Sequence, residues 1–140
     1  MARLANSSDP FHGIATHAVL ELHRRSESLH LTAQVLIEFR NLATRPRNVN
    51  GLGLSLADAE AKAASYESTL PLLVETPGIY PAWKSLVATL GVIGKQVHDA
   101  RLVAVCQVHS ITHILTFNVT HFTTLTRSGT SIVIVDPANI

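Results

Sequence analysis

The feature that most constrains the fold of this chain is an alternation of helix-patterned segments with short runs rich in β-branched residues. The clearest such runs are HILTF and SIVIVDP near the carboxyl end, which are separated by a polar connection. Longer segments with apolar residues at helical spacing come before them. Strands that alternate with helices are typical of an α/β sandwich with a mainly parallel sheet. We therefore expect an α/β fold.

Five segments have the pattern of helices. The first, DPFHGIATHAVLELHRR, begins with Asp9 as an acidic cap and has Pro10 at the first helical position. The third opens on Ser55 and Asp58, which resemble a capping signal. The predicted helices cover about 9–25, 33–44, 55–69, 79–91 and 96–108. Two further short strands are predicted at SLHLTA and PLLVE, between helices.

The length and composition favour one compact domain over residues 1–140. Of the 140 residues, 46% are hydrophobic and only 15% are charged, which argues against a disordered chain. No apolar run approaches the ~20 residues of a membrane helix, and the opening MARLANSSDP does not have the pattern of a secretory signal. The single Cys106 cannot form an internal disulfide. We expect a cytoplasmic protein without a membrane segment.

Neither the net charge nor the histidine content indicates a particular function. The net charge of +1 is too small to indicate nucleic-acid binding by itself, although local basic patches are compatible with it. The eight histidines are scattered along the chain. The closest helix-like pair, His109 and His113, spans a predicted junction between a helix and a strand. This spacing does not favour a histidine metal site.

Asp99 stands at the start of the apolar segment GKQVHDARLVAVC. In the first turn of a helix, the peptide dipoles stabilise a negative charge, which explains this residue without any function. The helix after it is apolar enough to lie inside the domain, however, so Asp99 would lie at the exposed end of a buried element. Both interpretations remain open.

Glu38 interrupts the apolar run VLIEF and has no lysine or arginine four residues away. Its helical neighbours Gln34, Asn41 and Arg45 form a narrow polar stripe, which would be solvent-exposed on an ordinary surface helix. In parallel sheets, functional groups gather at the carboxyl ends of strands and in the first turns of the helices that follow. Glu38 and Asp99 could meet there across one water-filled notch and share a divalent ion.

Asn118 follows the predicted strand HILTF and would supply a neutral oxygen at the same edge. Alternatively it only caps the short helix that begins NVTHF. The basic candidates for contact with RNA phosphates are Arg45 and Arg47 in ATRPRNVNG, and Lys95 in GKQVHDA. These side chains would equally well keep a loop soluble.

Four ordered motifs, VLIEFRNLATRP, NGLGLS, GKQVHDARLVA and ILTFNVTHF, together resemble the PIN-domain family, especially bacterial VapC-like toxins. The resemblance covers about Leu4 to Pro137. It implies a three-layer α/β/α sandwich and hydrolysis of RNA phosphodiester bonds with Mg²⁺ or Mn²⁺ as cofactor. Glu38 and Asp99 match family acids and would be metal ligands, and Asn118 would join them as a catalytic residue.

The chain departs from the family pattern in two places. The family usually has a first strand of the type LLDTNVLL that carries an acid, and this sequence has no such strand. Where the family often has an acid near the last motif, this chain has Asn118 and His121. Two carboxylates neutralise one divalent ion only in part, so we expect weak metal binding and weak or absent RNA cleavage. A version extended by a strand with Asp-Thr-Asn would then be the more active one.

Two other functions compete with this one. The doublet His98-Asp99 also occurs as a metal dyad in HD-type phosphohydrolases, but those are all-helical, and HILTF and SIVIVDP are strand-like. The non-enzymatic alternative is a PIN-like scaffold that binds an antitoxin or a second copy of itself, as family members commonly do. In that case Tyr80, Trp83 and Leu86, at helical spacing, would serve the interface; otherwise they pack in the core.

Overall fold

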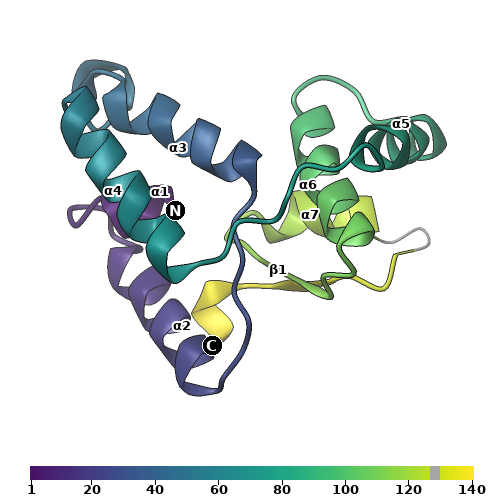
Figure 1. Cartoon of the computed structure of the whole chain (residues 1–140), viewed down its shortest axis with the longest axis horizontal. Helices are drawn as coiled ribbons and strands as arrows, with labels where there is room; N and C mark the ends of the chain where they lie inside the picture. The colour runs from purple at the N-terminus through teal and green to yellow at the C-terminus, as the bar shows by residue number, and fades with distance from the viewer. Residues whose placement is uncertain (127–129) are drawn as a thin grey trace. The chain divides into compact units, whose positions relative to one another are not determined.

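The structure is a computed structural model of the chain, and it describes residues 1–126 and 130–140 (Figure 1). Most elements are helices, and two short parallel strands accompany them, so the protein is of the mixed α/β class that the sequence predicts. The elements form two compact units. The N-terminal unit contains Met1–Val74 together with Ile140, and the C-terminal unit contains Glu75–Asn139. The prediction of a single domain stays a prediction.

The described elements of the N-terminal unit are helical. They are α1 (Ala2–Ala5), α2 (His12–Arg24), α3 (Ala33–Thr44), a short 3-10 helix (Arg47–Val49) and α4 (Leu56–Thr69). Hydroxyl caps set the starts of the two helices that form the core of this unit. Thr32 Oγ1 accepts the Val35 N–H at 3.2 Å before α3, and Ser55 Oγ accepts the Asp58 N–H at 3.1 Å before α4. Both helices therefore have the bounds that their sequence patterns predict.

Small side chains bring α3 and α4 together. Phe39 and Ala43 of α3 form a buried cluster with Ala59 and Ala63 of α4. Because alanine methyl groups are short, the two helix backbones can approach closely. The Phe39 ring meets the Tyr66 ring edge-on, with 5.5 Å between centroids, and this contact closes one end of the cluster.

Helix α2 begins three residues later than the pattern predicts. Asp9 does not cap the first turn of α2, because its Oδ1 accepts the Phe11 N–H at 2.8 Å in a local turn. The same oxygen accepts a hydrogen bond from Arg3 at 3.0 Å. The helix then starts at His12.

The predicted strands SLHLTA and PLLVE pair at only one position. Leu31 and Leu72 form an isolated parallel bridge, in which Leu31 donates to Pro71 and accepts from Leu73. The pairing is short because the cap of α3 follows Leu31 directly. These segments thus have the predicted extended conformation without forming strands of regular length.

The C-terminal unit holds the remaining elements. They are α5 (Ile79–Leu90), α6 (Gln96–Val108), β1 (His113–Leu115), α7 (Val119–Thr126), β2 (Val133–Val135) and a 3-10 helix (Pro137–Asn139). Gly91 ends α5 with φ of 62°, a left-handed conformation that glycine adopts without steric cost. Helix α6 has the bounds that the sequence predicts.

Helix α6 is the central element of this unit and packs against α5 and α7. Ala100, Val103, Ala104 and Val105 are at most 1% exposed. The buried core also includes side chains from α5, α7 and the segment before β2, namely Leu86, Phe122, Leu125 and Ile132. The prediction that the apolar helix after Asp99 lies inside the protein is confirmed.

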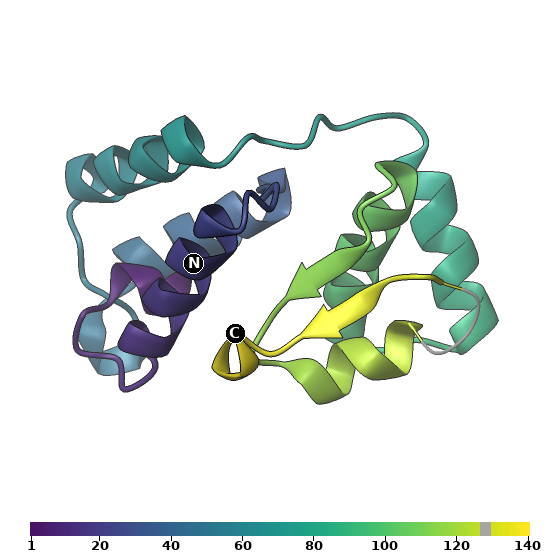
Figure 2. The same cartoon turned by 90° about the horizontal axis from the view of Figure 1, so that it is seen from below.

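The two strands pair in parallel, with His113 opposite Val133 and Leu115 opposite Val135 (Figure 2). Parallel neighbours need a crossover connection, and α7 provides it between β1 and β2. The predicted runs HILTF and SIVIVDP therefore contain true strands, each shorter than its run. Among the helices of residues 1–126 and 130–140, none is long and apolar enough to cross a membrane.

Candidate functional site

Asp99 lies in the first turn of α6, where the helix leaves the protein interior. Its side chain is 26% exposed, although Ala100 next to it is fully buried. The helix dipole stabilises a negative charge at this place. Asp99 Oδ2 lies 3.8 Å from Nδ1 of His121, which belongs to α7. The carboxylate therefore faces the helix that follows β1.

Asn118 connects β1 to α7 at the same edge. Its backbone N–H donates to Thr116 Oγ1 at 3.0 Å, which fixes the turn after the strand. Its side-chain amide nitrogen lies 3.1 Å from His121 Nδ1. Asn118 therefore does more than cap the start of α7, because its side-chain amide contacts the His121 imidazole. Asp99, Asn118 and His121 form one polar group, which we call the β1 edge.

His121 Nδ1 connects the members of the β1 edge, because it lies near both Asp99 and Asn118. When His121 Nδ1 carries a proton, it can donate toward Asp99; when it does not, it can accept from the Asn118 amide. The tautomer of the His121 imidazole thus decides which of the two neighbours Nδ1 can bind. His121 itself is 54% exposed, so water and solutes reach the group.

His121 is not among the functional residues that the sequence motifs predict. The motifs mark its position only as one near which the family often has an acid. A positional signal was nevertheless present, since His121 lies three residues after Asn118, and residues with that spacing at a helix start share one face. This spacing would have placed its ring beside Asn118.

Glu38 belongs to the N-terminal unit, where it lies on the exposed side of α3. Its Oε1 accepts a hydrogen bond from Gln34 Nε2 at 2.8 Å. This contact agrees with the polar stripe that the helical spacing predicts. The role of Glu38 as a metal ligand beside Asp99 stays a prediction.

The basic candidates have different local roles. The backbone carbonyl of Arg45 accepts the Gly53 N–H, and the side chain of Arg47 donates to the Leu52 carbonyl at 3.2 Å, so both stabilise the loop after α3. Lys95 is exposed directly before α6, four residues before Asp99. Lys95 is therefore the basic candidate that lies near the β1 edge in the chain.

The β1 edge offers few donors for a divalent ion. Asp99 and Asn118 provide oxygen atoms, which Mg²⁺ and Mn²⁺ prefer, and His121 offers a nitrogen that Mn²⁺ accepts more readily than Mg²⁺ does. Within the described part of the chain, no three His, Cys, Asp or Glu side chains cluster in a way that could hold a metal. An ion at this edge would thus keep most of its water ligands.

Comparison with known proteins found no match among protein-family models, curated proteins or solved structures. The four sequence motifs and the geometry of the β1 edge are therefore the grounds for a functional conclusion.

Proposed function

We propose that the chain is a PIN-like protein with a three-layer α/β/α architecture that hydrolyses RNA phosphodiester bonds weakly, with Mg²⁺ or Mn²⁺ as cofactor. The observation that carries this proposal is the β1 edge. There Asp99, from the start of a buried helix, meets Asn118 and His121 directly after a parallel strand. In α/β proteins, ligands bind in just such places, beyond the carboxyl ends of parallel strands.

Asp99 is the residue that would hold the ion, and the Asn118 amide would support it with a neutral oxygen. When bound, the ion supplies electrostatic stabilisation of the charge that develops on the phosphodiester. The resemblance alone implies that Glu38 would also be a metal ligand. Lys95, exposed before the same helix, would attract the phosphate of the RNA.

The charge balance of the β1 edge explains why the activity would be weak. It offers one carboxylate, which neutralises a divalent ion only in part. A high ion concentration should therefore be needed for activity.

The test is cleavage of a labelled single-stranded RNA in the presence of Mg²⁺ or Mn²⁺. Asp99→Ala and Glu38→Ala should each abolish the weak cleavage, because each removes a proposed ligand. Glu67→Gln is the matched control, since Glu67 is an exposed carboxylate on α4 whose nearest cation, Arg40, lies 3.6 Å away. Cleavage that survives Asp99→Ala, or that is lost equally in Glu67→Gln, would contradict the proposal.

A non-catalytic scaffold is the second candidate, and one observation favours it. Of the three residues proposed for an interface, Leu86 is buried at 8% exposure, whereas Tyr80 is 64% exposed on α5. Core packing therefore accounts for Leu86 but leaves Tyr80 available to an antitoxin or to a second copy of the chain. A scaffold would bind such a partner equally well after Asp99→Ala and would show no metal-dependent cleavage.

A further inference from the structure

The stretch of chain that contains α5 and the loop before α6 carries lysines but no acids. Residues 76–98 include Lys84 and Lys95 and lack both aspartate and glutamate. Both lysines are exposed, Lys84 on α5 and Lys95 directly before α6. This stretch therefore presents two positive charges to solvent with no negative side chain between them in the sequence.

The acids of the C-terminal unit have partners other than these lysines. Residues 75–139 contain three acids. Each lies near a group that is not a lysine: Arg101 for Glu75, His121 for Asp99 and the Ala138 N–H for Asp136. The two lysines are thus the cations of the stretch for which this unit supplies no printed counter-charge, and they can attract an anion from outside.

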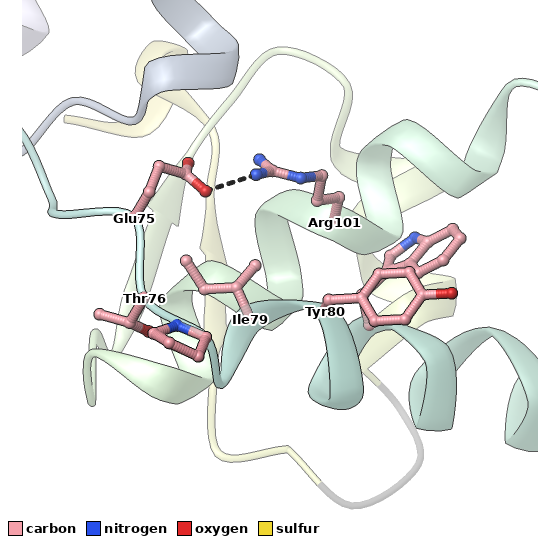
Figure 3. Close-up of a pocket in the computed structure, with 7 residues that line it drawn as sticks. Glu75, Thr76, Ile79, Tyr80 and Arg101 are labelled. Carbon is pink, nitrogen blue, oxygen red and sulfur yellow. Dashed lines mark hydrogen bonds and ion pairs between the residues drawn. The ribbon is translucent and has the colours of Figure 1, made fainter.

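An exposed aromatic ring lies on the same face of α5 as Lys84. Tyr80, Lys84 and Ala88 are four residues apart, which places them in one row along the helix, and all three are exposed. Tyr80 is 64% exposed. Figure 3 shows its ring pointing away from the ion pair of Glu75 with Arg101. The row therefore combines an open ring, a cation and a small side chain.

Trp83 supports the Tyr80 ring from within the unit. The centroids of the two rings lie 5.6 Å apart, and the rings are tilted by 36°. The Trp83 indole N–H donates to the Val97 carbonyl at 2.8 Å, and its ring packs against the core. Tyr80 thus has a fixed neighbour on one side while most of its own surface stays open to solvent.

The row leads into a loop with open space beside its cation. Gly91 and Gly94 have φ of 62° and 59°, and among the described residues no atom lies within 4 Å of a Cβ added to either. Between them, Val92 is 8% exposed and anchors the loop in the core, whereas Ile93 is 79% exposed. Lys95 follows the second glycine. Because the glycines have no side chains, a ligand backbone can come close to this loop.

We propose that Tyr80, Lys84 and Ala88 of α5, together with the loop 91–95, bind single-stranded RNA. We call these residues the α5 surface. Lys84 and Lys95 would contact phosphates, and one base would stack on the Tyr80 ring. Surfaces that bind single strands commonly combine cations for the backbone with aromatic rings for the bases. The proposal rests on the proposed function in that RNA is the ligand.

The chemistry of the α5 surface favours a nucleic-acid strand over an apolar protein partner. An apolar partner would bury two lysine charges without neutralising them, which costs free energy. A phosphodiester strand neutralises one lysine with each phosphate and releases counterions. Lys95 lies four residues before Asp99 in the chain. The α5 surface would thus hold the strand, while the β1 edge would act on it.

The experiment measures how salt affects the binding of a fluorescently labelled uridine decamer to the full chain, by anisotropy and in EDTA. The logarithm of the affinity should fall linearly with the logarithm of the salt concentration, and each lysine contact should contribute about 0.7 to the slope. Lys84→Gln and Lys95→Gln should therefore each reduce the slope by about 0.7. Lys84→Arg should keep it, because it keeps the charge.

Lys62→Gln is the matched control. Lys62 is also an exposed lysine on a helix, but it belongs to α4 of the N-terminal unit. The substitution changes the net charge by the same amount as Lys84→Gln does. It should leave the slope unchanged, so the comparison separates a local contact from an effect of net charge.

The contribution of Tyr80 is tested with a decamer of the same charge that lacks bases. Tyr80→Ala should weaken binding of the uridine decamer at least about fivefold, the lower range for loss of one stacked base, and Tyr80→Phe should keep it. The abasic decamer should bind the unchanged chain more weakly, and Tyr80→Ala should not alter its affinity. Circular dichroism of each variant checks that the fold is retained.

The proposal is overturned if both lysine variants keep the slope of the unchanged chain, or if Lys62→Gln lowers the slope as much as they do. Absence of RNA binding at low salt would overturn it too, and this is the result expected if the α5 surface binds a protein. Undiminished binding by folded Tyr80→Ala would contradict stacking on this ring.

Failure of the proposed function would look different. RNA binding with the expected slopes, but without cleavage in Mg²⁺ or Mn²⁺, would refute the cleavage and support the α5 surface. Metal-dependent cleavage by a chain whose RNA affinity does not respond to Lys84→Gln and Lys95→Gln would refute the α5 surface alone.

Discussion

At the scale of single residues, the β1 edge differs from a metal site built of acids alone, because its side chains meet at the His121 imidazole. Asp99 and Asn118 lie 3.8 Å and 3.1 Å from that one nitrogen. A cation at Asp99 would therefore meet one carboxylate with an imidazole beside it rather than a cluster of acids. This arrangement predicts an ion that binds weakly.

Cys106 gives a prediction about reactivity. Burial raises the pKa of its thiol from about 9 to about 11, and its side chain belongs to the buried core of the C-terminal unit. At pH 8 this shift reduces the reactive thiolate about 100-fold. The native protein should react with a thiol reagent far more slowly than the denatured protein does. Equally fast labelling of both states would show that Cys106 is accessible.

At the scale of elements, two glycines give opposite predictions. Gly91 ends α5 at φ of 62°, and no atom lies within 4 Å of an added Cβ, so Gly91→Ala tests the backbone conformation alone. We expect it to lower the free energy of unfolding by about 1 kcal/mol. Gly13→Ala, in α2 with equally open space, should instead raise it by up to about 1 kcal/mol.

Urea unfolding of the two glycine variants, followed by circular dichroism, measures both effects. The signs should differ, because a left-handed residue disfavours a side chain and a helical residue favours one. If Gly91→Ala were as stable as the unchanged chain, the end of α5 would not have the left-handed conformation described above.

The sequence predicts helices in this chain better than strands. The bounds of α3 and α6 follow from the apolar spacing and, for α3, from the Thr32 cap, which are local signals. SLHLTA and PLLVE have equally good strand composition but form only one bridge, because strand pairing depends on partners that are distant in the chain. The start of α2 differs because a turn around Asp9 competes with the helix cap.

The candidate site could likewise be predicted from the sequence only in part. Placing Asp99 and Asn118 near the β1 edge required only the order of helices and strands and the rule for parallel sheets. The contact of Asn118 with His121 follows from their spacing of three residues. The contact of Asp99 with His121 depends on how α6 packs against α7, which no local pattern encodes. The ion pair of Glu75 with Arg101 could not be predicted for the same reason, because 26 positions of sequence separate the two residues.

At the scale of the whole molecule, the β1 edge belongs to the C-terminal unit. Helix α6, whose buried residues form much of the core of this unit, carries Asp99 in its first turn. The same buried helix would thus position the group proposed for ion binding. Glu38 belongs to the N-terminal unit, and its part in metal binding is predicted by the resemblance alone.

The most direct test of the account is a titration of isotope-labelled protein with Mn²⁺, which broadens the NMR signals of nearby nuclei. We expect the signals of Asp99, Asn118 and His121 to broaden first. Asp99→Asn should abolish the effect, whereas Glu67→Gln should not change it. Broadening elsewhere that leaves the β1 edge unaffected, or that persists in Asp99→Asn, would contradict the claim that Asp99 holds a divalent ion.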